Sequence, residues 1–446
     1  MSARLLSFCP GSLVTMHEAS LYRRSLATLG LFTLAAGDLW RYLLSWWGWG
    51  AIVLVLFALA VIELIRMRVD LRLLPYPLMA FLTLAAVSIA WSAYPGASAL
   101  GVAGLFVTAT FGLYLATALD LTTFVRSLGT ALRWILALSL AFELFVSTVI
   151  RDRVLPFWVD YSSLDKIPAA FFWSRDLLFA GGRIQGIVGN SNLLAFAALL
   201  AVIVFGVQIA ARSTSRFWTS LWLLVALLTL ALTRSSTVLV AGAVVGLVAI
   251  FLWLVRRVPE ERRMRWLVLG AAVAAAGIAA AIVFRDAILG VLGKSPDLTN
   301  RFGIWDTVLG LANQRPAVGW GWIGYWAPWV EPYDDLVVIR GVHYYQAHNA
   351  WIDVFLQLGI VGLIVFGALV VSTLSRGWSR ALDLARGRGK AIGLLPVLVT
   401  VMLIVHSLAE SRLLIEIGFA LLVVFAIRTR SNRGQNQHLP GIATRA

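Results

Sequence analysis

The pair His348–Asn349 is where this chain has the residue types needed for acid–base chemistry. It ends a long polar loop and opens the apolar segment AHNAWIDVFLQLGIVGLIVF, so it lies where a membrane would meet water. The chain has only five histidines, and a neutral imidazole can take a proton near neutral pH. Arginines on the same side could hold an anion. A base beside an anion site suits a transferase whose donor is activated by phosphate, although a lone histidine at a helix start can also be a capping or packing residue.

Three arginines are candidates for the anion site. Arg234 lies in a short turn at the start of an apolar helix, where free amides and the helix dipole favour an anion; it could instead extend to lipid headgroups. Arg183 precedes another apolar segment and could instead form a salt bridge within its loop. Arg301 opens a predicted helix, where a positive charge is unfavourable with the dipole. A bound anion could compensate, as could Asp297 or Asp306.

Other polar residues complete the set of candidates. His343 and Asp353 are alternative bases, and His343 is also a candidate for substrate binding. Asn349 could orient a sugar hydroxyl or the imidazole of His348. We expect no metal site, because two histidines spaced by five without a helix-spaced carboxylate are a weak ligand pattern.

Two further groups have structural interpretations. His406 and Glu410 are four residues apart on one face of an apolar helix, so we expect them to pair with each other. The run Asn190, Ser191 and Asn192 could cap the helix that follows it.

The elements that must position these residues are membrane helices. Sixty per cent of the residues are apolar and the mean hydropathy is +0.86, which excludes an ordinary soluble domain. Backbone groups in lipid must be satisfied within their own segment, so the predicted class is an all-α polytopic membrane protein. The single cysteine excludes an intramolecular disulfide. We expect no cleavable signal, because the first apolar stretch runs directly into further spans.

We predict about twelve spans, separated in places by long loops. Residues 1–284 would hold spans one to nine with an outer loop at 150–191, residues 285–347 a large loop with a helix near 300–313, residues 348–429 spans ten to twelve, and residues 430–446 a tail. The spans lie near 26–44, 48–66, 74–93, 97–118, 128–149, 192–211, 217–232, 236–255, 266–284, 349–373, 391–408 and 412–428.

The basic residues orient these spans. The formal net charge is +15, and arginine clusters follow spans two, eight, ten and twelve. Positive loops face the cytoplasm, so both termini are predicted to be cytoplasmic and both long loops periplasmic. This use of the charge makes nucleic acid an improbable partner. The large loop is too aromatic to be disordered. Its aromatic residues could form an interfacial belt or stack on sugar rings: Trp320, Trp322, Tyr325, Trp326, Trp329, Tyr333, Tyr344 and Tyr345.

One motif resembles a known family. His348, Asn349, Gly359 and Gly362 follow the pattern of His, then Asn, Ser or Gln, then nine residues, then Gly-x-x-Gly. This pattern is similar to that of the bacterial O-antigen ligase family, within the larger ligase and polymerase superfamily. The family's next small residue and glycine are replaced here by Leu-Ile. The glycine pair would let another helix approach closely. The loops RFGIWDTVLGLANQRPAVGWG and RIQGIVGNSNLLA also resemble the superfamily, and the resemblance extends over roughly residues 180–420.

The resemblance implies a fold and a reaction. The fold would be a GT-C-like glycosyltransferase in the bacterial inner membrane. The enzyme would move O-antigen polysaccharide from undecaprenyl pyrophosphate to lipid A–core oligosaccharide on the periplasmic face, without a metal or cofactor and with inversion. His348 would be the general base, while Arg301 and Arg234, with Arg183 as a third candidate, would hold the donor pyrophosphate.

Three other functions remain open. An O-antigen polymerase would use the same donor with another lipid-linked glycan as acceptor, and a protein O-oligosaccharyltransferase would glycosylate serines. A transporter of lipid-linked sugars would need a charged path through the membrane, where the main central charges are Glu63, Arg133 and Glu143.

Overall fold

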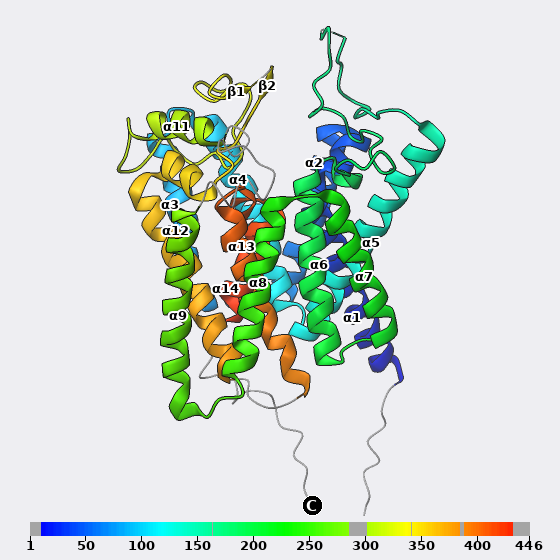
Figure 1. The fold of residues 1–446 in the computed structure, drawn as a ribbon, viewed down its shortest axis with the longest axis vertical. Helices are drawn as coiled ribbons and strands as arrows, with labels where there is room; N and C mark the ends of the chain where they lie inside the picture. The colour runs from blue at the N-terminus through cyan, green and yellow to red at the C-terminus, as the bar shows by residue number, and fades with distance from the viewer. Residues whose placement is uncertain (1–9, 163, 285–300, 340, 384–387, 431–446) are drawn as a thin grey trace, which may run out of the picture.

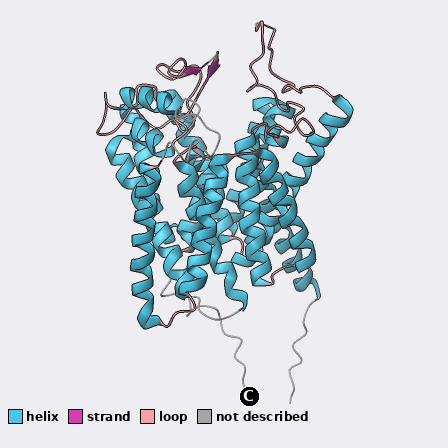
Figure 2. Ribbon diagram, in the orientation of Figure 1, coloured by secondary structure: helices cyan, strands magenta, loops and turns pink. Residues whose placement is uncertain are grey.

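The computed structural model describes residues 10–162, 164–284, 301–339, 341–383 and 388–430. These residues are mostly helical, with one small hairpin above the helices (Figure 2). The elements are α1 (Pro10–Ala35), α2 (Gly37–Arg66), α3 (Tyr76–Val87), α4 (Pro95–Thr117), α5 (Leu121–Phe145), α6 (Ser191–Ala211), α7 (Arg216–Thr233), α8 (Ser236–Val255), α9 (Glu260–Val283), α11 (Arg301–Ala312), β1 (Val338–Ile339), β2 (Val342–His343), α12 (Ala350–Asp383), α13 (Leu395–Ser407) and α14 (Glu416–Arg428).

The helices form one bundle (Figure 1). Each of the predicted apolar segments falls on a helix. In the described parts of the chain, seven helices are long and apolar enough to cross a membrane, namely α2, α4, α5, α6, α7, α8 and α12, and two shorter apolar stretches cover Tyr76–Trp91 and Ala391–Ser407. The predicted class, an all-α polytopic membrane protein, is confirmed. In its most apolar window, α6 is 72% buried against 17% for α2, so α6 lies inside the bundle.

The start of the bundle differs from the prediction. Spans were expected at 26–44 and 48–66. A kink at Ser45 inside α2, where φ is +67°, coincides with the expected boundary, whereas a further break at Ala36, between α1 and α2, divides the first expected span. Arg41 therefore lies near the start of α2 and pairs with Glu416 of α14 at 2.5 Å. The physical reason is that charged side chains are costly in hydrocarbon and are stable where they meet a partner.

The two ends of the bundle carry different segments. The described parts of both long loops lie at the end shown uppermost in Figure 1, here called the outer end. At the opposite end Arg380 donates to the carbonyls of Arg428 and Arg430, and Arg430 donates to the carbonyl of Leu74 at 2.6 Å. Basic residues that follow spans ten and twelve thus gather at one end, together with the segment after α2. The range 285–300, with Asp297, and the range 431–446 lie outside the described residues.

The large loop, of which residues 301–339 and 341–347 are described, has a core of its own. Ile304 and Val308 of α11 pack with Trp326 and Tyr333 of the following loop, and all four side chains are buried. Trp322 is also fully buried. Of the aromatic residues weighed for a belt or for sugar stacking, these three serve as core, while Tyr325 and Trp329 are exposed. The loop is consequently a folded cap on α12.

Gly359 fixes this cap to α12, and it does so differently from the prediction. It has φ +63° and interrupts the helix. The segment after α11 approaches there, with Ile360 N donating to Pro316 O at 2.8 Å. A Cβ at Gly359 would lie 2.3 Å from Ala317 O. The close approach comes from this loop backbone and not from another helix, so the first glycine of the motif positions the cap next to His348.

Candidate functional site

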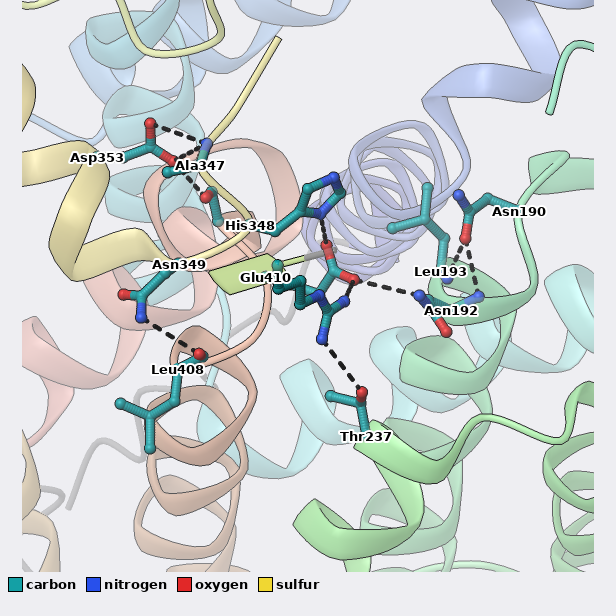
Figure 3. Close-up of polar contacts among 12 residues, drawn as sticks. Asn190, Asn192, Leu193, Thr237, Ala347, His348, Asn349, Asp353, Leu408 and Glu410 are labelled. Atoms are coloured by element: carbon teal, nitrogen blue, oxygen red, sulfur yellow. Dashed lines mark hydrogen bonds and ion pairs between the residues drawn. The ribbon is translucent and has the colours of Figure 1, made fainter. Parts of the chain in front are cut away.

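His348 lies at the outer end, immediately before α12. Its backbone has φ +50°, a conformation that costs free energy in a residue other than glycine. Its Nδ1 lies 2.8 Å from Oε2 of Glu410, and its ring meets the edge of Tyr344. The side chain is 18% exposed. In the described part of the chain Nε2 has no hydrogen-bond partner, and Figure 3 shows the ring directed at Glu410 through its other nitrogen.

Glu410 is the centre of the site, and the sequence analysis missed this role. It follows α13 and accepts from Arg301 at 2.6 Å, from Asn192 at 3.2 Å and from His348 (Figure 3). Burial alone would raise the pKa of Glu410, but His348 and Arg301 lower it from 4.5 to about 2. The carboxylate is therefore ionised at neutral pH. Because a carboxylate only accepts, Nδ1 of His348 donates to Glu410, and in the neutral imidazole Nε2 is then the nitrogen that can act as a base.

The expected pairing of His406 with Glu410 is wrong. His406 is buried against the ring of Phe196, with ring centroids 4.9 Å apart. Its Nε2 has no hydrogen-bond partner within the described residues. The chain turns immediately after α13, so Glu410 leaves the helix face and points to His348. An acid in a short turn at the membrane boundary was the available signal.

Asn192 connects Glu410 to Arg183. Its amide nitrogen donates to Glu410, while its oxygen accepts from Arg183 at 2.7 Å and from Ser235 at 2.9 Å. The expected capping role belongs to Asn190 alone, whose oxygen accepts from the amides of Asn192 and Leu193. Asn192 is therefore free of the cap and presents its two ends to a carboxylate and to a cation.

A buried carboxylate anchors the loop that carries Arg183. Glu143, at the end of α5, accepts from Ser174 at 2.9 Å and from the amides of Gln185 and Gly186 at 2.8 and 2.7 Å. Arg183 Nε also donates to the carbonyl of Thr233 at 3.2 Å. These bonds fix Arg183 beside the turn between α7 and α8.

A small pocket opens where this loop meets the start of α6. Its volume is about 200 Å³, and it is lined by Arg175 and Arg183 together with four polar residues, two alanines and a glycine: Gln185, Asn190, Ser191, Asn192, Ala169, Ala170 and Gly189. Burial and the charges of Arg175 and Arg301 lower the pKa of Arg183, although an arginine remains charged at neutral pH. Two guanidinium groups facing one pocket give it the charge to hold an anion.

Arg234 lies against the loop that carries Arg183. It ends α7 with φ +47° and is exposed. Its guanidinium is 3.7 Å from the place that a Cβ of Gly181 would take, so it lies against the same loop as Arg183. Neither Arg183 nor Arg234 has a carboxylate partner among the residues that the structure describes. The positive charge here is thus not balanced by described acidic residues.

Arg301 is placed differently from the other two arginines. It is 8% exposed, and its guanidinium is bound to Glu410 and lies 3.5 Å from Thr237 Oγ1. The predicted helix at 300–313 is confirmed as α11, which begins at Arg301. The compensating anion expected at this helix start is Glu410, rather than Asp306 on the same helix.

Asn349 and His343 do not reach the imidazole. The oxygen of Asn349 accepts from the amides of Trp351 and Ile352, which caps α12, and its nitrogen donates to Leu408 O at 3.3 Å. His343 is exposed in β2, with Nδ1 2.8 Å from Asp334 O. The structure thus gives Asn349 a capping task and makes no contact between His343 and the Glu410 cluster.

Asp353, the other candidate base, is buried and fully engaged. It accepts from Trp326 Nε1 at 2.9 Å, from the amide of Ala347 at 3.1 Å, and from the hydroxyl of Ser411. With these donors around it and no exposed surface, its carboxylate is not open to a substrate. His348 is therefore the candidate base that the geometry favours.

The site can do two things. The Nε2 of His348 can accept a proton, and ionised Glu410 can stabilise the imidazolium that forms. Next to it, through Asn192, Arg183 and its neighbours can hold a negatively charged group. Among the residues that the structure describes, no group of three or more His, Cys, Asp or Glu is placed to hold a metal ion.

Part of this chain is similar to known proteins. Residues 219–367 match a family model described as O-antigen ligase, a range that includes Arg234, Arg301 and His348. The exopolysaccharide production protein ExoQ of Rhizobium meliloti (strain 1021) is 25% identical over 313 residues, which cover 66% of this chain and 63% of the relative. The chain thus spans less than two thirds of that relative's length. Together with the all-α bundle and the motif that begins at His348, these matches support membership of the O-antigen ligase/polymerase superfamily, and residues 219–367 are the part of the chain that matches its family model.

Proposed function

We propose that this protein is an O-antigen ligase. It would move O-antigen polysaccharide from undecaprenyl pyrophosphate to lipid A–core oligosaccharide, at the outer end of the bundle, on the periplasmic face of the inner membrane. The observation that carries the proposal is the base His348, paired with Glu410, beside the pocket of Arg175 and Arg183. A base and an anion site within one hydrogen-bonded cluster are the two groups that such a transfer requires.

In this mechanism the acceptor hydroxyl gives its proton to Nε2 of His348. Its oxygen then attacks the anomeric carbon of the donor sugar, and the bond from that carbon to the pyrophosphate oxygen breaks with inversion. Ionised Glu410 stabilises the imidazolium as it forms. Arg183 and Arg234 hold the departing undecaprenyl pyrophosphate, because a guanidinium meets two phosphate oxygens at once and stays charged. These cations would replace a divalent metal by the same electrostatic stabilisation.

Arg301 takes a different task in this proposal from the one expected from the sequence. Donor binding was expected of it, but its buried ion pair with Glu410 favours orientation of that carboxylate. We therefore expect Arg301→Met to reduce the turnover rate while donor affinity stays close to that of the wild type. A large loss of donor affinity in this variant would return Arg301 to the pyrophosphate site.

The second candidate is a polymerase that uses the same donor. The similarity to a protein named for exopolysaccharide production supports it, because a polymer grows when another lipid-linked glycan is the acceptor. A transporter has less support: Glu63 pairs with Arg23 at 2.8 Å and Arg133 bonds to Gln208 at 3.1 Å, while Glu143 binds loop groups. These central charges have local structural partners and supply no continuous charged path.

Reconstitution separates these functions. The purified full chain in liposomes receives an undecaprenyl pyrophosphate-linked glycan and either lipid A–core or a second lipid-linked glycan as acceptor. Consumption of lipid A–core supports the ligase, and consumption of the second glycan supports the polymerase. Strong chelator should leave the rate unchanged.

His348→Ala tests the base in the same assay. It should lower the rate by about a hundred- to ten-thousandfold, with donor binding retained. His343→Ala is the matched control, because this exposed histidine is outside the cluster and should keep the wild-type rate. Normal transfer by His348→Ala would remove the proposed base.

A further inference from the structure

Asp353 touches both segments that carry the candidate catalytic pair. It lies in the first turn of α12, and its side chain is completely buried. Its oxygens accept from the amide of Ala347, the residue before His348, at 3.1 and 3.3 Å. They also accept from the hydroxyl of Ser411, the residue after Glu410. One carboxylate therefore joins the neighbours of two residues that are far apart in the sequence (Figure 3 shows the bonds to Ala347).

A third contact ties this carboxylate to the cap. Trp326, whose ring is buried in the outer core, donates its indole N–H to Asp353 at 2.9 Å. The two oxygens of one carboxylate can together accept from all three donors. A buried carboxylate costs free energy unless such donors surround it. Asp353 is therefore stable only when the segments that carry Trp326, Ala347 and Ser411 are all in place around it.

The backbone of His348 needs this restraint. Its φ of +50° is unfavourable for a residue with a side chain, and the direction of its imidazole depends on that backbone. The bond to the amide of Ala347 restrains the backbone on one side of His348. The hydrogen bond that the Asn349 side chain accepts from the amide of Trp351, at the start of α12, restrains it on the other side. On the partner segment, the bond to Ser411 fixes the turn that presents Glu410.

We propose that Asp353 is a positioning residue, which aligns His348 with Glu410 and does not itself contact donor or acceptor. This inference rests on the proposed function, since it concerns the same transfer reaction. A displacement of about 1 Å at a reacting group can cost about a hundredfold in rate. Loss of Asp353 should therefore appear in the turnover rate and leave donor affinity unchanged.

Gln357 offers a matched control one turn further along α12. It is equally buried and also holds the cap, accepting from the amides of Ile323 and Gly324 at 2.9 and 2.8 Å. It touches neither neighbour of the catalytic pair. Asp353→Leu and Gln357→Met each remove a buried cap contact, but only the first removes the alignment.

The test measures turnover, donor affinity and melting temperature of the full chain in liposomes or detergent. We expect Asp353→Leu to lower turnover by about a hundredfold, and Gln357→Met to lower melting temperature with turnover within about threefold of the wild type. Asp353→Asn, whose oxygen can accept from Trp326 and Ala347 and whose amide group can donate to the hydroxyl of Ser411, should recover most of the rate. Equal losses in the Leu and Met variants, or no rescue by Asn, would overturn the positioning role.

Ser411→Ala keeps the proposal testable if Asp353→Leu does not insert. It removes one arm of the contact and should lower turnover by about two- to tenfold. In the Asp353→Asn background, where the contact to Ser411 is rebuilt, Ser411→Ala should lower turnover by a similar factor; no effect of Ser411→Ala in either background contradicts the proposal. His348→Ala serves as the reference. If this variant retains turnover, the proposed function fails. If it loses turnover while Asp353→Leu stays fully active, only the positioning role is overturned.

Discussion

Glu410→Gln is the substitution that tests the site most directly. The amide keeps the size of the side chain but removes the charge that faces His348 at 2.8 Å and Arg301 at 2.6 Å. When His348 takes the proton of the acceptor, it becomes an imidazolium, and the carboxylate stabilises that charge in the transition state. The interaction is therefore stronger in the transition state than before it, which is the condition for an effect on turnover.

The size of the effect follows from the contact. A hydrogen bond to a charged partner contributes about 1.5–3 kcal/mol, and each 1.36 kcal/mol is a factor of ten in rate. Glu410→Gln should therefore lower turnover by about ten- to two-hundredfold. Donor affinity should change little, because Arg183 binds Asn192 and the carbonyl of Thr233 and does not pair with Glu410.

The substitution also leaves Arg301 buried without a counter-charge. Breaking such a pair from one side costs about 3–5 kcal/mol of stability, whereas removing both partners is often close to neutral. The double variant Glu410→Gln/Arg301→Met should therefore recover much of the lost melting temperature. It should not recover turnover, because His348 still lacks its carboxylate.

The assay is single-turnover transfer by the reconstituted chain, with melting temperature measured in parallel. Wild-type turnover in Glu410→Gln would falsify the pairing of His348 with Glu410 as a catalytic unit. Recovery of turnover in the double variant would mean that Glu410 acts only as the counter-charge of Arg301.

Three further predictions concern the donor site, the cap and pH. Arg183→Ala should weaken donor binding by about tenfold or more, measured by equilibrium binding, while the exposed Arg151→Ala on the same loop should not; equal affinities in both would count against the pyrophosphate site. Gly359→Ala should lower the free energy of unfolding by about 2–5 kcal/mol, because of its φ of +63° and the 2.3 Å approach of Ala317 O; Gly367→Ala on the same helix, with 4.0 Å of space, is the control, and equal melting temperatures would contradict the docking. The pKa of Glu410 is lowered from 4.5 to about 2, so its charged form stabilises the fold above pH 4.5. The difference in melting temperature between the wild type and Glu410→Gln should therefore decline as pH falls from 4.5 toward 2. A difference that grows as the pH falls would refute the assignment.

Much of the architecture could be predicted from local sequence. Every predicted apolar segment is helical, and the helix beginning at Arg301 was expected, because span length and hydropathy are properties of a continuous segment. The predicted span bounds did not include the turn at Ala36, and the partner of Arg41, which is Glu416, comes from the far end of the chain. The core role of Trp322 and Trp326 was also missed, as burial depends on what folds over them.

The site residues show the same distinction between what is local in the sequence and what depends on folding. Residue type, scarcity and spacing identified His348, and composition placed it at a membrane boundary near arginines. Tertiary structure alone decided that Glu410, and not Asn349, faces the imidazole, and that Arg301 is paired while Arg183 and Arg234 lack a described carboxylate partner. The physical reason is that a side chain's chemistry is local, whereas its charge partners and burial come from segments brought together by folding, here from α6, α11, α12 and the turn after α13.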